Sequence, residues 1–345
     1  MSKVIQVGNI SIGGNNPIRV QSMCNTNTRD VVSTVAQIKR LEALGCEIIR
    51  VAVPDSVAAE AISSIIPQIT IPLIADIHFD YKLAIEAMQN GAAAVRINPG
   101  NIGGRENTCK VLEVAADMGR AVRVGVNSGS LERDLLSAHG VTAEALVKSA
   151  LRQLEILESV NFSNYKVSIK ASSVPLTVEA YKLFTKHSDA PLHVGVTEAG
   201  TKRMGTIKSA VGIGALLLQG IGDTIRVSLT AEPEEEIHAA WGILTAAGVR
   251  KRGVEIISCP TCGRTEIDLI ALAERVEALC DTVHREITVA VMGCVVNGPG
   301  EAKEADYGVA GGRGVGLLFR KGEIVKKVNE NELLSELMKM INADQ

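Results

Sequence analysis

The stretch PLIADIHFDYKLAIEAMQNG, residues 72–91, contains one complete unit of the fold. It begins with a short apolar run, 72–78, which predicts a β-strand with Asp76 and His78 near its end. A helix is predicted over 81–91, because apolar residues recur there at spacings of three and four and Gly91 follows them. A strand, a loop and an amphipathic helix in this order form the building unit of parallel sheets.

The same unit recurs between residues 18 and 247. The predicted strands are IRVQSM (18–23), EIIRVAVP (47–54), PLIADIH (72–78), AAVRINP (93–99), AVRVGVN (121–127), KVSIKAS (166–172), LHVGVTE (192–198) and TIRVSLT (224–230). Helical patterns such as 31–45 and 144–160 lie between them. Eight units in about 230 residues predict an α/β fold, a closed (β/α)8 TIM barrel, as a domain spanning residues 1–248. A doubly wound open sheet is the alternative, although it usually has fewer units.

The composition restricts the class of protein. A chain of 345 residues suggests about two domains. Aromatic residues make up only 3% and the net charge is −3, so we expect no nucleic-acid partner. Residues 1–14 alternate apolar and polar residues, which predicts a strand pair and not a targeting segment. No apolar run approaches the roughly 20 residues of a membrane helix, and we expect a cytoplasmic protein with reduced cysteines.

Polar and charged residues recur near the carboxyl ends of the predicted strands. They are Gln21, Ser22, Arg50, Asp76, His78, Arg96, Asn98, Arg123, Asn127, Lys170, Glu198, Arg226 and Ser228. A barrel gathers these ends on one face, where barrel enzymes carry their active sites. Any single one of them is equally compatible with a salt-bridged surface residue. Five cations in equivalent positions indicate a bound anion, because several positive charges in a partly desolvated mouth are otherwise costly.

The chemistry of these cations indicates phosphate. Arginine offers a planar fork and lysine a point charge, and both suit phosphate oxygens. The loop NPGNIGG, 98–104, adds backbone N–H groups that glycine leaves accessible. We therefore expect a ligand with more than one phosphate. Glu198 in TEAG either balances charge or acts as a proton donor or acceptor facing the anion.

A smaller α+β domain is predicted over 252–345, after a short charged linker. A strand leads into CPTCG, a helix follows over 266–280, and further strands are predicted at 286–293, 314–319 and 323–328, before a terminal helix. The glycine-rich run 308–316 is followed by a strand and not by a helix. It therefore predicts a turn and not a nucleotide-binding fingerprint.

Three cysteines of this domain form an incomplete metal site. Cys259 and Cys262 are spaced C-x-x-C, and Cys294 opens the loop of VMGCVVNGPGE (291–301), which ends in Glu301. Structural zinc requires four N or S ligands, for which only the isolated Cys280 and His284 are further candidates. A dithiol redox pair leaves Cys294 unexplained. An iron–sulfur cluster accepts three thiolates with an oxygen or nitrogen ligand at the fourth iron.

Several long motifs in both predicted domains resemble those of one known family. ISCPTCGR (257–264) and VMGCVVNGPGE, with thirty-one residues between Cys262 and Cys294, resemble the 4-hydroxy-3-methylbut-2-enyl diphosphate synthases, the iron–sulfur enzymes of the non-mevalonate isoprenoid pathway. The segments VQSMCNT, ADIHFD, VRINPGN, VRVGVNSGS, VSIKAS, VTEAG and IRVSLT resemble the barrel of that family in the same order. The short linker between the two predicted domains is similar to that of the two-domain bacterial form of the family.

The resemblance implies a [4Fe–4S] cluster held by Cys259, Cys262, Cys294 and Glu301. It implies the substrate 2-C-methyl-D-erythritol 2,4-cyclodiphosphate, which is reductively opened and dehydrated to 4-hydroxy-3-methylbut-2-enyl diphosphate by two one-electron transfers. The diphosphate would be held by Arg50, Arg96, Arg123, Asn127, Lys170, Arg226 and Ser228, with Asp76 and His78 close by and Glu198 as the acid. Ferredoxin or flavodoxin would donate the electrons, and the family assembles as a head-to-tail homodimer.

Two other classes of function stay open on the residues alone. One is a phosphate-binding TIM-barrel lyase or transferase, such as an aldolase or a pterin-dependent synthase, with a structural zinc module. The other is a non-enzymatic metal module that docks a partner, against which the five barrel cations count.

Overall fold

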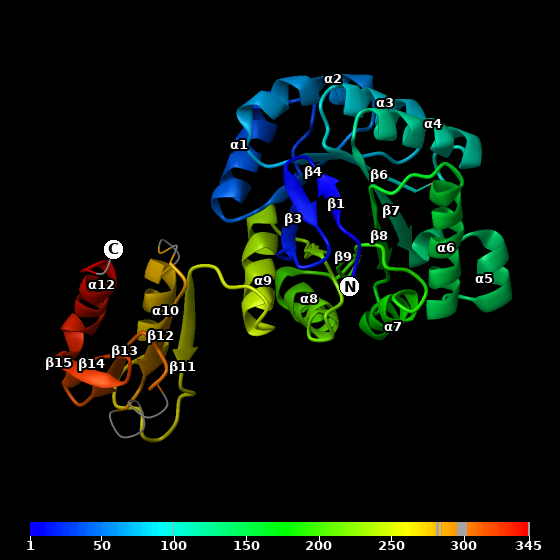
Figure 1. Ribbon diagram of the computed structural model, residues 1–345. Helices are drawn as coiled ribbons and strands as arrows, with labels where there is room; N and C mark the ends of the chain where they lie inside the picture. Colours follow the sequence, from blue (N-terminus) through cyan, green and yellow to red (C-terminus); the bar gives the residue numbers. More distant parts are fainter. Residues whose placement is uncertain (99, 281–282, 284, 295–301, 344–345) are drawn as a thin grey trace. The chain divides into compact units, whose positions relative to one another are not determined.

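The computed structural model describes residues 1–98, 100–280, 283, 285–294 and 302–343 of the chain. The chain divides into two compact units, Met1–Arg250 and Lys251–Gln345 (Figure 1). This division falls inside the short charged linker of the sequence. Each unit has its own hydrophobic core and is described by itself.

The first unit is a barrel of eight parallel strands. They are β3 (Arg19–Met23), β4 (Ile48–Ala52), β5 (Leu73–Asp76), β6 (Ala94–Ile97), β7 (Ala121–Asn127), β8 (Tyr165–Lys170), β9 (His193–Val194) and β10 (Thr224–Ile225). Strands β3 to β8 follow one another, and β10 lies between β3 and β9. A parallel bridge from Val167 to Leu192 joins β8 to β9, so the ring closes. The predicted TIM barrel is confirmed.

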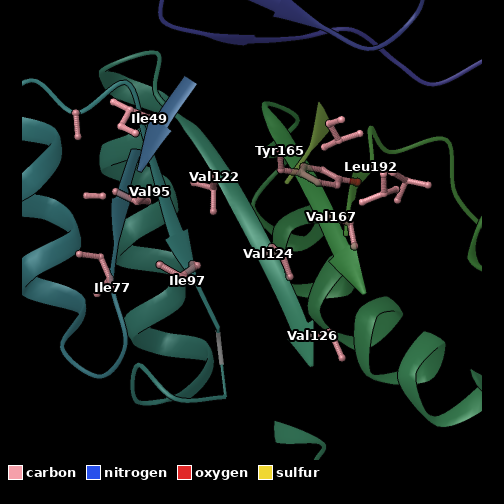
Figure 2. Close-up of a cluster of buried hydrophobic side chains, with 14 of the residues drawn as sticks. Ile49, Ile77, Val95, Ile97, Val122, Val124, Val126, Tyr165, Val167 and Leu192 are labelled. Carbon is pink, nitrogen blue, oxygen red and sulfur yellow. The ribbon is translucent and has the colours of Figure 1, made fainter. Parts of the chain in front are cut away.

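Helices surround this ring (Figure 1). They are α1 (Val31–Ala43), α2 (Ser56–Ile65), α3 (Tyr81–Gln89), α4 (Gly104–Asp117), α5 (Arg133–His139), α6 (Ala143–Ser159), α7 (Val174–Phe184), α8 (Lys202–Leu217) and α9 (Pro233–Ala246). Side-chain caps define where several of them begin: Asp30 accepts from the Ser33 N–H, and Asp55 from the Ala58 N–H. Strand residues such as Val95, Val122 and Val124 pack beneath the helices in a continuous apolar core (Figure 2).

A hairpin closes the amino end of the barrel. Strands β1 (Ile5–Val7) and β2 (Ile10–Ile12) pair antiparallel, which confirms the strand pair predicted for the N-terminus. Buried side chains of the hairpin, including Val7 and Ile12, pack on residues at the beginnings of the barrel strands. Apolar packing therefore seals this end, and polar side chains are left for the other.

The last two barrel strands are shorter than their predicted ranges, 192–198 and 224–230. Beyond Val194 the backbone leaves the regular ladder. The Thr197 N–H donates to the Ala171 carbonyl, and the Leu229 N–H donates to the Glu236 carboxylate instead of to a strand. These strand ends are shaped by the groups around the barrel mouth.

Among its described residues, the second unit has a five-stranded sheet and two α-helices. Strands β11 (Val254–Ser258), β12 (Ile287–Met292) and β13 (Tyr307–Gly312) run parallel, and β14 (Val315–Arg320) and β15 (Glu323–Asn329) complete the sheet antiparallel. Helices α10 (Leu269–Cys280) and α12 (Leu333–Ala343) pack on it. The predicted turn is confirmed only at Arg313 and Gly314, which connect β13 to β14. The rest of the glycine-rich run belongs to these two strands, and β13 was not predicted. Within the described ranges, no helix is long and apolar enough to cross a membrane.

Tyr181 on α7 supports the barrel where its hydrogen-bond ladder is thinnest. Its hydroxyl accepts from the Ile169 N–H of β8 at 3.0 Å and donates to the His193 carbonyl of β9 at 2.6 Å. Burial raises the pKa of Tyr181, so the hydroxyl remains protonated and can donate. One side chain thus joins both strands of the closing seam.

Replacing Tyr181 by Phe should weaken this seam, because two buried backbone groups lose a partner. An unsatisfied buried polar group costs about 1–3 kcal/mol, so we expect the free energy of unfolding in urea to fall by about 2 kcal/mol. Tyr81→Phe is the control, because the Tyr81 hydroxyl makes no hydrogen bond within the described part of the chain. Identical unfolding curves for Tyr181→Phe and wild type would contradict the role of the hydroxyl.

Candidate active site

Strand alternation gives the barrel a polar interior. Successive side chains of a strand point to opposite faces, and the apolar ones of β7 (Val122, Val124 and Val126) pack on the helices (Figure 2). The residues between them, including Arg123 and Asn127, therefore face inward. The same alternation in β8 directs Lys166, Ser168 and Lys170 into the barrel.

Asp76 at the end of β5 is the anionic centre of this interior. Its residue is 3% exposed, and its carboxylate accepts a hydrogen bond from Arg96 Nη1 at 3.2 Å. Arg50 Nε lies 3.7 Å and His78 Nε2 lies 3.5 Å from Asp76 Oδ2. Burial alone would raise the pKa of Asp76, but Arg50, the His78 contact and Arg96 together hold it well below its ordinary value. Asp76 is therefore ionised and orients two arginines on different strands.

A second buried carboxylate, Glu236, comes from the first turn of α9. It accepts from Ser22 Oγ and from the Leu229 N–H, both at 3.0 Å, and lies 3.5 Å from Arg226 Nε. Glu236 was not predicted from the sequence. The helical pattern could have identified it, because Glu236 lies on the same buried face of α9 as Ile237 and Ala240.

A deeper polar layer lies below the mouth, inside the barrel. Lys166 Nζ, on a residue 1% exposed, lies 3.4 Å from Gln21 Oε1 and 3.5 Å from Thr224 Oγ1. His193 Nδ1 shares a 2.8 Å hydrogen bond with the same threonine. Burial lowers the pKa of Lys166 and of His193 well below their ordinary values. Lys166 was not predicted from the sequence, although KVSIK places it on the same face as Lys170.

Positive groups outnumber negative ones in this interior. Arg50, Arg96, Arg123, Lys166 and Lys170 are buried and Arg226 is half-buried, against the carboxylates of Asp76 and Glu236. Arg96 Nε and two nitrogens of Arg123 have no hydrogen-bond partner among the described residues. Burial lowers the pKa of Arg50 to about 9 and that of Arg123 and Lys170 well below their ordinary values. A polyanion would supply both the missing charge and the missing acceptors.

Two inward-facing glycines make room for the cations. A Cβ added to Gly125 would lie 3.2 Å from both Arg96 Nε and Ser168 Oγ. At Gly195 it would lie 2.6 Å from Lys170 Nζ and 2.4 Å from the Arg226 carbonyl oxygen. Glycine in a strand often marks such a close approach. These positions were not identified from the sequence, because their neighbours become visible only in the folded barrel.

The remaining predicted ligands of the mouth are more accessible. Asn127 and Ser228 are half-buried, and the His78 side chain is 55% exposed. Asn98 orders the following loop by accepting from the Gly100 N–H at 3.1 Å, and Pro99 lies outside the described residues. Glu198 is exposed and has a left-handed backbone, with φ of 51°. This conformation is strained for glutamate and occurs mainly where the surrounding structure imposes it.

The second unit brings two predicted metal ligands to one edge of its sheet. Because β11 and β12 are parallel neighbours, Cys259 and Cys294 follow strand ends at the same edge. The N–H of Gly293 donates to Cys259 Sγ at 3.3 Å. Cys262 is exposed, and a hydrogen bond from the Arg264 backbone lowers the pKa of its thiol. Thiols with backbone N–H donors suit a thiolate-ligated iron–sulfur cluster.

The full predicted ligand set is not assembled in the described part of the chain. Glu301 lies outside the described residues, as does His284, a zinc candidate. No three His, Cys, Asp or Glu side chains among the described residues are grouped closely enough to hold a metal ion. Cys280, the other zinc candidate, is buried in the apolar core of the second unit. The donor types fit a cluster at the β11–β12 edge, and the cluster assignment stays a prediction.

Two protein-family domains match the chain. The GcpE TIM-barrel domain matches residues 2–241, and the GcpE protein C-terminal domain matches residues 255–343. The chain belongs to the GcpE family. GcpE relatives from Caldanaerobacter subterraneus subsp. tengcongensis (58% identical over 342 residues, 99% of this chain and 96% of the relative) and Fusobacterium nucleatum subsp. nucleatum (56% over 344 residues, 99% and 97%) are each named 4-hydroxy-3-methylbut-2-en-1-yl diphosphate synthase (flavodoxin). The predicted family is thereby confirmed.

Solved structures share the GcpE barrel fold. Dihydropteroate synthase from Yersinia pestis aligns with a TM-score of 0.51 at 12% identity, covering 72% of this chain and 100% of that chain. N-acetylneuraminic acid (sialic acid) synthetase from Leptospira borgpetersenii serovar Hardjo-bovis aligns with a TM-score of 0.52 at 16% identity, covering 72% and 90%. At these identities the likeness concerns the fold alone.

Gly195→Ala should disturb the cation cluster specifically. The new methyl group must displace Lys170 or the β10 backbone, and such overpacking costs about 1–3 kcal/mol. We expect the dissociation constant for inorganic pyrophosphate, measured by calorimetry, to rise about tenfold. Gly242→Ala on α9 is the control, because no atom lies within 4 Å of its added Cβ. Equal pyrophosphate affinity in both variants would contradict the close packing of Gly195 and Lys170.

Proposed function

We propose that the chain catalyses the reductive ring opening and dehydration of 2-C-methyl-D-erythritol 2,4-cyclodiphosphate to 4-hydroxy-3-methylbut-2-enyl diphosphate. The observation that carries this proposal is the buried excess of cations over carboxylates at the carboxyl ends of the barrel strands. In a GcpE chain, a diphosphate supplies the charge that balances it. The names of the relatives support the same reaction.

The diphosphate binds among the inward cations in this proposal. Its ligands are Arg50, Arg96, Arg123, Asn127, Lys170, Arg226 and Ser228. The unpartnered nitrogens of Arg96 and Arg123 support this assignment, because they are buried donors without acceptors among the described residues. Asp76 acts through the arginines that it orients, and His78 borders the mouth. Fixed donors of this kind hold the carbon skeleton in one orientation.

We assign the [4Fe–4S] cluster to the second unit. Cys259, Cys262, Cys294 and Glu301 would hold it, and the Gly293 N–H bond to Cys259 supports thiolate at that position. When bound, the cluster supplies two electrons in single transfers and a Lewis-acidic iron. The relatives' names favour flavodoxin over ferredoxin as the electron donor. The cytoplasmic location stays a prediction.

Glu198 is the acid of the proposed reaction. Release of one oxygen as water requires a proton, and Glu198 follows β9 at the carboxyl end of the barrel. The left-handed backbone of Glu198 supports a functional role for this residue, because glutamate has no intrinsic preference for that conformation. The exposed carboxylate makes no hydrogen bond or ion pair to the described residues, which leaves it available to a ligand.

Glu198→Gln should separate proton donation from binding. The amide keeps the shape of the side chain but cannot donate a proton as an acid, so turnover should fall by about 10²–10⁴. Pyrophosphate affinity and the visible absorbance of the cluster should not change. Glu60→Gln on the exposed surface of α2 is the matched control. Full turnover by Glu198→Gln with an intact cluster would show that another group supplies the proton.

We also propose a head-to-tail homodimer in which each cluster unit serves the barrel of the other copy. An exposed apolar stripe on α8 supports self-association. It consists of Met204, Ile207 and Val211 on the helix and of Leu218 directly after it. Beside it lies a groove of about 630 Å³ lined by Val174, Val178, Leu183, Val211 and Ala215 and bordered by Glu144, Glu179, Lys182 and Lys186. This surface has an apolar stripe, a groove beside it and charges of both signs, so it can be complementary to itself. Such a surface suits contact with a second copy related by a twofold axis.

Ile207→Glu should shift the enzyme toward monomers, because a charge would be buried without a partner in the α8 contact. Light scattering should give the mass of two chains for wild type and a lower mass for the variant. Val57→Glu is the control, since Val57 is comparably exposed on α2, outside the stripe. A fully active wild-type monomer would overturn the dimer proposal.

The reaction itself is tested on protein purified without oxygen. We expect iron and sulfide in equal amounts, visible absorbance, and conversion of the cyclic diphosphate when reduced flavodoxin is present. The alternative, a TIM-barrel lyase or transferase with a structural zinc module, gives a colourless zinc protein without this conversion. These outcomes separate the two functions in one preparation.

A further inference from the structure

Met23 lies between two arginines of the barrel interior. Its strand, β3, is flanked by β4, which carries Arg50, and by β10, which Arg226 directly follows. Met23 pairs with Arg50 in the sheet register. Arg50 Nε and Nη2 donate to Met23 Sδ at 3.2 and 3.0 Å, and Arg226 Nη1 lies 3.8 Å from the same sulfur.

The sulfur is an unusual partner for a guanidinium group. A thioether is a weak, uncharged acceptor. The Asp76 carboxylate lies 3.7 Å from Arg50 Nε, beyond hydrogen-bond distance, whereas Arg96 donates to it at 3.2 Å and Arg226 lies 3.5 Å from Glu236. Arg50 and Arg226 repel each other, because two like charges approach the same sulfur. Burial first, and then Arg226, lower the pKa of Arg50. A polarisable neutral atom between them can accept from both cations without cancelling either charge.

The residue type at position 23 therefore matters for an anion-binding site. A carboxylate there would pair with both guanidinium groups and compete with an incoming anion. A leucine would fill the space but leave two buried donors of Arg50 without this acceptor. A thioether orients the donors and is easily replaced by a better acceptor.

We propose that Met23 is a positioning residue for Arg50 and Arg226. Its sulfur holds the two guanidinium groups in place, and they leave the sulfur when the diphosphate binds. This inference rests on the proposed function, since it assigns the anion that takes the place of the sulfur. Met23 then acts on substrate affinity through the two arginines. It takes no part in proton or electron transfer.

Two substitutions at this position have different expected effects. Met23→Leu keeps the approximate volume and removes the acceptor, so the dissociation constant for pyrophosphate and KM should rise threefold to tenfold with kcat nearly unchanged. Met23→Glu adds a carboxylate between the guanidinium groups. It should weaken pyrophosphate binding more than a hundredfold and at the same time raise the melting temperature, because it compensates buried positive charge.

The experiment measures inorganic pyrophosphate binding by calorimetry, thermal unfolding, and turnover on the full chain purified without oxygen. Met118→Leu, a half-buried methionine at the end of α4, is the control for the loss of a thioether. We expect Met118→Leu to bind pyrophosphate as wild type does. The opposite changes in affinity and stability for Met23→Glu are the decisive readout, because a purely structural role would lower both together.

Each other outcome has a distinct meaning. Wild-type pyrophosphate affinity in Met23→Leu, or a parallel loss of stability and binding in Met23→Glu, overturns the positioning role. If the wild type neither binds pyrophosphate nor converts the cyclic diphosphate, the proposed function fails, and with it the anion in this inference. In that case the melting temperature of Met23→Glu still tests whether position 23 lies between two buried cations.

Discussion

The ion pairing around Asp76 is the interaction on which the barrel interior depends. Its carboxylate joins Arg50 of β4 to Arg96 of β6 across β5, inside a ring where water has little access. Unpaired charges in such a setting are destabilising, and the carboxylates are too few to pair every cation. The barrel thus remains incompletely neutralised by its own residues. Stability of the free protein and affinity for an anion are consequently opposed at the same side chains.

The apolar framework makes this arrangement tolerable. Valines and isoleucines on the outer faces of the strands bury a continuous layer under the helices, and the N-terminal hairpin closes the amino end with apolar side chains. Burial of this layer contributes roughly 25 cal/mol per Å² of apolar surface, independently of what the inner faces carry. Because a strand separates its two faces strictly, the barrel can gather cations inside without weakening the packing outside.

The sequence predicted those features that depend on local periodicity. The eight strand–helix units, the closed barrel and the position of Arg96, Arg123 and Lys170 near the carboxyl ends of their strands follow from such patterns. Lys166 was not predicted because the prediction considered only the strand ends and not the inward positions further down the strand. Glu236 was not predicted because α9 was not considered as a source of inward carboxylates. The contacts of Gly195 and of Met23 depend on side chains from neighbouring strands, so no local pattern contains them.

The C-x-x-C cysteines and the buried cations belong to different units of the chain. The basic cluster belongs to Met1–Arg250 and the C-x-x-C cysteines to Lys251–Gln345. A thiolate beside an unpartnered buried arginine would form an ion pair, which would neutralise the phosphate site and weaken the thiolate as a metal ligand. At the β11–β12 edge, Cys259 Sγ instead accepts from a neutral backbone N–H. Within its own unit, each set of residues therefore retains the charge that its proposed ligand requires.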